Sequence, residues 1–82
     1  MLDSGAQEAG QRDPRLVLSP RETEVLDLAS LGLTNAQIAL RLRVTIHAVK
    51  FHLAAVYRKL GVSNRTTAVG LYLRNHRNEV VE

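Results

Sequence analysis

At 82 residues the chain is long enough for one small domain, whose core is too limited to enclose a large active site. It has no cysteine, which excludes a disulfide framework and a thiolate metal site. No apolar run approaches the roughly 18 residues that span a bilayer, and the first residues lack the apolar segment of a signal peptide. We therefore expect a soluble, cytoplasmic protein with no membrane partner.

The formal net charge of +3 is unevenly distributed along the chain. Residues 1–40 carry six acidic and three basic side chains, whereas residues 41–77 carry eight basic side chains and no acidic one. A solvated protein surface usually mixes both signs. A segment of one sign and this length therefore indicates a surface that binds a polyanion such as nucleic acid.

The chain divides into a central domain and two tails. Residues 1–15 are rich in Gly, Gln, Asp and Ala and lack a periodic apolar pattern, which is typical of a flexible tail or a linker. We expect one folded domain over residues 16–75 and a frayed tail over residues 76–82. The sequence contains no internal repeat and no low-complexity run.

The pattern Ser19-Pro20-Arg21-Glu22 predicts the start of the first helix. Ser19 is suited to the N-cap, Pro20 to the first helical position, and Glu22 to the reciprocal bond of a capping box. We expect this helix to run to about residue 30 or 31. Its predicted inward positions are Val25, Leu28 and Ala29.

A second capping box, formed by Thr34 and Gln37, opens a short helix. Only two residues separate this helix from Thr45, the expected N-cap of a longer helix over residues 46–60 that ends at Gly61. Two helices joined so tightly are typical of a helix-turn-helix, in which the second helix enters the major groove of DNA. Other proteins use such pairs only for packing, so the turn alone leaves both functions open.

The helix over residues 46–60 has two different faces. One continuous apolar stripe, which must be buried, consists of Val49, Leu53, Val56 and Leu60. The opposite face has no acidic member and consists of His47, Lys50, Phe51, Ala54 and Arg58. An amphipathic core helix with a solvated basic side would show the same pattern. The basic half of the chain around it favours contact with DNA.

The outward face predicts which residues meet DNA. Lys50 can donate to guanine O6 or N7, Phe51 can meet a thymine methyl group, and Ala54 offers a small apolar contact. With His47, which faces outward near the helix start, they form the predicted set of base contacts. The predicted phosphate contacts are Thr34, Asn35, Arg43, Thr45, Arg58, Lys59 and Arg65. Free amides at the helix starts can add anion contacts.

The same residues offer little for catalysis or for a metal. His47 and His52 point about 140° apart on a helix, so they cannot share one ion. The sequence has no Gly-rich phosphate loop and no nucleophile with a neighbouring base. We expect no enzymatic activity, no metal and no cofactor.

Seven sequence blocks carry a resemblance to a known family. They are Leu18-Ser-Pro-Arg-Glu22, Glu24-Val-Leu26, Gly32-Leu-Thr-Asn35, Ile38-Ala39, Val49-Lys50-Phe-His52, Arg58-Lys-Leu-Gly-Val-Ser63 and Arg65-Thr-Thr-Ala-Val69. In this fixed order they resemble the C-terminal DNA-binding domain of the LuxR family, also called the NarL/FixJ or GerE type. The resemblance covers roughly residues 16–74. It implies an all-α four-helix bundle with a central helix-turn-helix that binds promoter DNA as a dimer.

The resemblance also implies partners for the domain. The fourth helix, expected over residues 65–74 with Ser63 or Asn64 as its cap, would form the dimer contact. We assign this contact to Thr66, Val69, Tyr72 and Leu73. Many family members carry an N-terminal receiver or sensor domain, so the chain fits the output module of a response regulator in a two-component system. Small single-domain members also exist, and RNA polymerase is a further possible partner.

Three positions depart from the family pattern. Arg43 stands where Gly is common, so its backbone must either avoid a left-handed conformation or tolerate a cost of about 1 kcal/mol. Ala48 stands where Thr or Ser is common, which removes one hydroxyl that could reach a phosphate. Ala54 is often a long polar residue in relatives, so base recognition here would depend on Lys50, Phe51 and DNA shape.

Two alternatives remain open from the sequence. A sigma-factor region-4-like module shares a basic helix-turn-helix but acts with RNA polymerase, and promoter binding without polymerase would count against it. A helical protein-binding module with no nucleic-acid role would bind its partner in a salt-insensitive manner.

Overall fold

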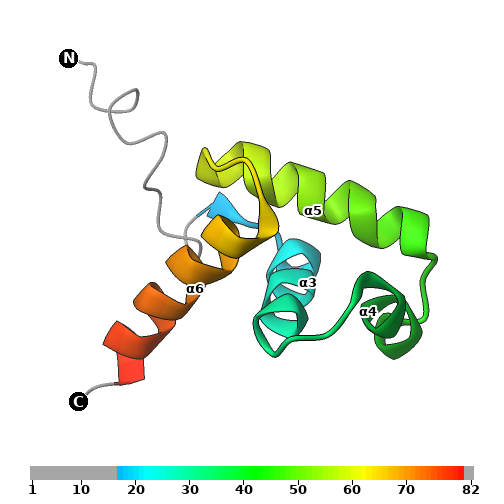
Figure 1. The fold of residues 1–82 in the computed structure, drawn as a ribbon, viewed down its shortest axis with the longest axis horizontal. Helices are drawn as coiled ribbons and strands as arrows, with labels where there is room; N and C mark the ends of the chain where they lie inside the picture. Colours follow the sequence, from blue (N-terminus) through cyan, green and yellow to red (C-terminus); the bar gives the residue numbers. More distant parts are fainter. Residues whose placement is uncertain (1–16, 81–82) are drawn as a thin grey trace.

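The computed structural model describes residues 17–80, and it describes side chains through Asn75. The predicted tail over residues 1–15 lies outside this range. Within it the chain forms four helices and no strand: α3 (Pro20–Ser30), α4 (Asn35–Leu42), α5 (Ile46–Leu60) and α6 (Arg65–Val80). The all-α, four-helix prediction is confirmed for this part of the chain (Figure 1).

Local side-chain bonds fix three of the helix starts. The Ser19 hydroxyl accepts from the Glu22 amide at 3.1 Å, and the Glu22 carboxylate accepts from the Ser19 amide at 2.9 Å. Thr34 and Gln37 form the same reciprocal pair at 3.1 and 2.8 Å. Thr45 caps α5 through its hydroxyl. Each bond satisfies an amide that the first helical turn leaves free, so the predicted starts are confirmed.

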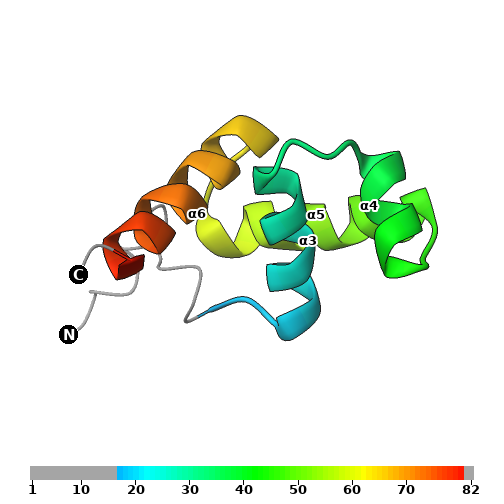
Figure 2. The ribbon, with the colours of Figure 1, turned by 90° about the horizontal axis from the view of Figure 1, so that it is seen from below.

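α5 lies along one side of the fold, packed against α3, with α4 and α6 at opposite ends of this pair (Figures 1 and 2). Its predicted apolar stripe is buried. The cluster shared by α3, α4 and α5 consists of Val25, Leu28, Ala29, Ile38, Ala39, Val49 and Leu53. The cluster shared by α3, α5 and α6 consists of Leu26, Val56, Leu60, Ala68, Leu71 and Tyr72. Since α3 contacts α6 as well as α4, it buries Leu26 in addition to the predicted Val25, Leu28 and Ala29.

α6 begins as expected and ends later than expected. The Asn64 side-chain oxygen accepts from the Thr67 amide at 2.8 Å, which identifies Asn64 as the cap. The helix continues to Val80, so the predicted end at residue 74 is wrong. Residues 75–80 contain neither Gly nor Pro, the residues that most often end a helix. The predicted frayed tail over residues 76–82 therefore overlaps helical backbone as far as Val80.

Candidate nucleic-acid interface

The turn between α4 and α5 is built on a strained arginine. Arg43 has φ 62° and ψ 45°, and it is the one non-glycine residue with a positive φ among residues 17–80. The Arg43 amide donates to the Leu40 carbonyl, and the Val44 amide donates to the Ala39 carbonyl at 3.0 Å. These bonds are typical of a Schellman helix end. The sequence left open whether Arg43 avoids the left-handed conformation or tolerates its cost. The structure shows that it adopts this conformation.

The outward face of α5 is exposed along its length. All five side chains predicted to face outward are exposed: His47, Lys50, Phe51, Ala54 and Arg58. Phe51 is 69% exposed, and its ring packs edge-to-face with that of His52, with ring centroids 5.8 Å apart. Because the opposite stripe is buried against α3, α4 and α6, the helix cannot rotate without exposing its core side chains. The fold therefore fixes which side chains α5 presents.

Five of the predicted phosphate contacts keep donor groups that the fold leaves free. Arg43 and Arg58 are exposed, and neither guanidinium has an acceptor within residues 17–75. Thr34 and Thr45 accept capping bonds through their hydroxyl oxygens, which leaves each hydroxyl proton free to donate. Asn35 is the first residue of α4 and is partly exposed. The arrangement presents donors at both ends of the helix-turn-helix.

Lys59, predicted to contact phosphate, forms an ion pair within the fold. Its ammonium group lies 2.8 and 3.1 Å from the two carboxylate oxygens of Glu22, whose residue is only 8% exposed. Burial raises the pKa of the Glu22 carboxyl, but the hydrogen bonds from Lys59 and Ser19 outweigh it, so the pKa is lowered. Lys59 thus joins α5 to α3, and its charge is already compensated.

Arg65 is also directed into the protein. Its guanidinium donates to the Asn35 side-chain oxygen at 3.1 Å, to the Ala29 carbonyl at 3.3 Å and to the Leu33 carbonyl. These acceptors are 30, 36 and 32 residues away along the chain. Two of them are backbone atoms, which no residue pattern marks. This role of Arg65 was therefore missed from the sequence.

The predicted dimer residues divide into two pairs. Tyr72 is 9% exposed and donates through its hydroxyl to the Asp27 carboxylate at 3.0 Å, so it belongs to the core and not to an outer surface. Val69 packs against both core clusters. Thr66 and Leu73 are exposed on α6, and Leu73 is 41% exposed. Only this second pair is fully available to a partner.

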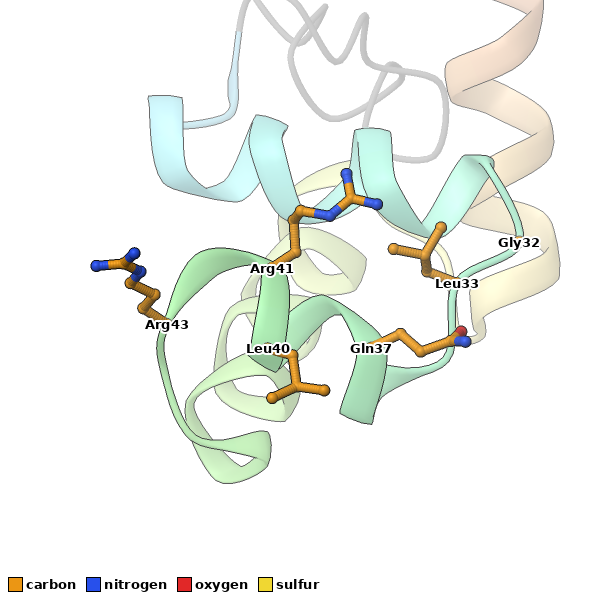
Figure 3. A pocket seen from close by; sticks show the side chains of 6 residues that line it. All are labelled: Gly32, Leu33, Gln37, Leu40, Arg41 and Arg43. Carbon is orange, nitrogen blue, oxygen red and sulfur yellow. The ribbon is translucent and has the colours of Figure 1, made fainter.

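An open groove of about 760 Å³ lies between the end of α3 and α4, beside the strained turn. It is lined by Gly32, Leu33, Gln37, Leu40, Arg41 and Arg43. Figure 3 shows these side chains pointing in different directions, so they surround a depression and do not enclose a small molecule. The lining has two cations and no acid, and it extends the positive surface around Arg43.

No group of three or more His, Cys, Asp or Glu side chains within the described part of the chain could hold a metal ion. His47 is exposed and His52 is half-buried on a different side of α5. Among the helices of residues 17–80, none has the length and apolar character needed to cross a membrane.

A short capped helix, a tight turn and a longer helix with an exposed basic face define the helix-turn-helix class of DNA-binding proteins. The family profile described as "Bacterial regulatory proteins, luxR family" (GerE) matches residues 16–72. The chain therefore belongs to the luxR family, a family of DNA-binding transcriptional regulators, and the predicted resemblance is confirmed.

Individual relatives agree with this assignment. The probable transcriptional regulatory protein SgaR of Hyphomicrobium methylovorum is 48% identical over 82% of this chain and 32% of its own length. The nitrate/nitrite response regulator protein NarP of Escherichia coli is 41% identical over 85% of this chain and 31% of its own length. The crystal structure of the response regulator ChrA, from a heme-sensing two-component system, matches with a TM-score of 0.69 and 43% identity over 77% of this chain and 31% of that one. The chain thus spans about a third of the length of these relatives.

Proposed function

We propose that this chain binds double-stranded promoter DNA by placing α5 in the major groove. The observation that carries the proposal is the orientation of α5: its apolar stripe is buried and its exposed face has no acidic side chain. A rod of this width fits the major groove, and its basic face complements the phosphates along the groove edges. This region matches relatives named as response regulators and relatives named as transcriptional activators. Because both kinds regulate transcription, we propose DNA binding, and no more specific activity, for this chain.

The proposed contacts follow from the chemistry of each exposed group. Base contacts are assigned to His47, Lys50, Phe51 and Ala54. Phosphate contacts are assigned to Thr34, Asn35, Arg43, Thr45 and Arg58. Lys59 and Arg65 are left out of the set, because Lys59 is paired with Glu22 and the Arg65 guanidinium is bonded to Ala29, Leu33 and Asn35.

Lys50→Ala tests the proposal directly. A duplex selected from a random pool supplies the target, and removing one base contact should weaken specific binding by about 1–3 kcal/mol. Arg21→Ala is the matched control, since it removes one positive charge from α3 outside the proposed contact set. Amide signals of residues 47–58 should shift when the duplex is titrated into the labelled protein. If parent and Lys50→Ala bind the duplex equally well and the amide shifts occur on another surface, α5 is not the recognition helix.

A dimer contact through α6 is the second part of the proposal. Thr66 and Leu73 are exposed on α6, and Gly70 lies between them in the sequence. A Cβ atom built at Gly70 meets nothing within 4 Å, so the adjoining surface is open to a second helix. A footprint that covers two half-sites one helical turn apart would support this contact.

A further inference from the structure

We propose that Arg65 is a positioning residue for the DNA interface, which acts through Asn35 and does not itself touch DNA. This inference rests on the proposed function, because it explains how one of the proposed phosphate contacts is held. It also replaces the role that the sequence suggested for Arg65, which was a direct phosphate contact.

One guanidinium connects three parts of the fold. Arg65 is the first residue of α6, and its acceptors lie at the end of α3 (Ala29), in the connection (Leu33) and at the first position of α4 (Asn35). The connection holds no other long-range side-chain bond within the described residues. The start of α4 is therefore held in place by α6.

The chemistry of the pair decides how the Asn35 amide is oriented. A guanidinium has donors only, so Asn35 must present its oxygen to Arg65 and keep both amide hydrogens for another acceptor. Within residues 17–75 those hydrogens have no acceptor. Asn35 is partly exposed, at a helix start where backbone amides are free and negative charge is favoured. An exposed anionic oxygen is the acceptor that fits, and in the proposed complex it belongs to a DNA phosphate.

Asn35→Asp separates positioning from stability. Aspartate keeps an acceptor for Arg65 and suits a helix start, so thermal stability should be retained or raised. It has no hydrogens for the phosphate and adds a negative charge beside it. Binding to the selected duplex should therefore weaken by at least about tenfold. Parental affinity in Asn35→Asp would overturn the proposal.

The salt dependence of binding separates an indirect role of Arg65 from a direct one. Arg65→Ala should weaken binding about three- to tenfold while the slope of log K against log salt stays at the parental value, since no phosphate contact of Arg65 is lost. Arg58→Ala, as the matched control, should reduce the slope by about one. A reduction of about one in Arg65→Ala would show that Arg65 itself contacts a phosphate.

Two further comparisons complete the test. Arg65→Lys keeps the charge but not the planar fork, so it should bind as weakly as Arg65→Ala; parental affinity would show that charge alone is sufficient. In the Arg65→Ala background, Asn35→Ala should have little further effect, whereas additive losses would show that the two residues act independently. All variants are compared at a temperature where circular dichroism shows them folded. Unchanged binding in both Lys50→Ala and Arg58→Ala would instead reject the proposed function.

Discussion

Phe51 is the residue that most distinguishes the exposed face of α5. The neighbouring outward positions are basic or small, yet this large apolar ring is 69% exposed, and the aromatic ring beside it is that of His52. A phenyl ring has no hydrogen-bonding group, so in a groove it can recognise apolar features alone. The C5-methyl group of thymine is the apolar feature of the major groove.

Replacing thymine by uracil tests this role of Phe51. Single substitutions across the selected duplex should reduce affinity about fourfold at the contacted position, which corresponds to burial of one methyl group at about 0.8 kcal/mol. The loss should disappear in Phe51→Ala and persist in Lys50→Ala, as fluorescence anisotropy would measure. A uracil effect that persists in Phe51→Ala would assign the methyl contact to another side chain.

The Glu22–Lys59 ion pair makes stability depend on pH. The pKa of Glu22 is lowered in the folded state, so the ionised carboxylate stabilises the fold. This contribution is present above the unfolded pKa of about 4.3, and it is lost as the pH falls through the lower pKa of the folded state. Glu22→Gln should reduce the free energy of unfolding by about 1–2 kcal/mol at pH 7 and by much less near pH 3. Urea unfolding at both pH values measures the difference. Glu24→Gln, in the exposed Arg21–Glu24 pair, is the control and should change little.

At the scale of the helices, an interaction was predicted from the sequence when its partners lie close along the chain and was missed when they lie far apart. Helix starts depend on partners three residues away, so Ser19, Thr34 and Thr45 could be identified as caps from the sequence. The buried stripe of α5 was equally predictable, because periodicity is local. The partners of Lys59 and Arg65 lie at least 30 residues away, and a basic side chain looks the same whether its partner is DNA or a buried carboxylate. The sequence therefore predicted the exposed face of α5 but not the long-range bonds of Lys59 and Arg65 that support it.

The turn between α4 and α5 combines strain with a proposed phosphate contact. Arg43→Gly should stabilise the fold by about 1 kcal/mol, because glycine adopts φ 62° without a Cβ clash. The same change should weaken DNA binding and reduce the salt slope by about one. Arg43→Ala keeps the strain and removes the charge, so it should show the binding loss without the gain in stability. Parental binding in both variants would remove Arg43 from the interface.

At the scale of the whole molecule, α6 connects the two proposed surfaces. Its first residue, Arg65, holds the start of α4, and Tyr72 joins its middle to Asp27 on α3. Figures 1 and 2 show α6 at the end of the molecule opposite α4. α5 starts beside α4, so a partner bound to the exposed side of α6 would leave this first part of α5 free, which a dimer on adjacent half-sites requires.

Leu73→Asp tests whether α6 carries the dimer contact. Leu73 is 41% exposed, so its replacement should lower the free energy of unfolding by about 1 kcal/mol, while a charge in an apolar contact should raise the dimer dissociation constant by at least about tenfold. Sedimentation measures the dissociation constant, and the footprint should shrink to one half-site. Leu40→Asp introduces the same charge at a leucine that is 81% exposed on α4, and it should leave self-association unchanged. Equal self-association of parent and Leu73→Asp would place the dimer contact on a different surface, because a buried aspartate at an apolar contact cannot be tolerated without a partner.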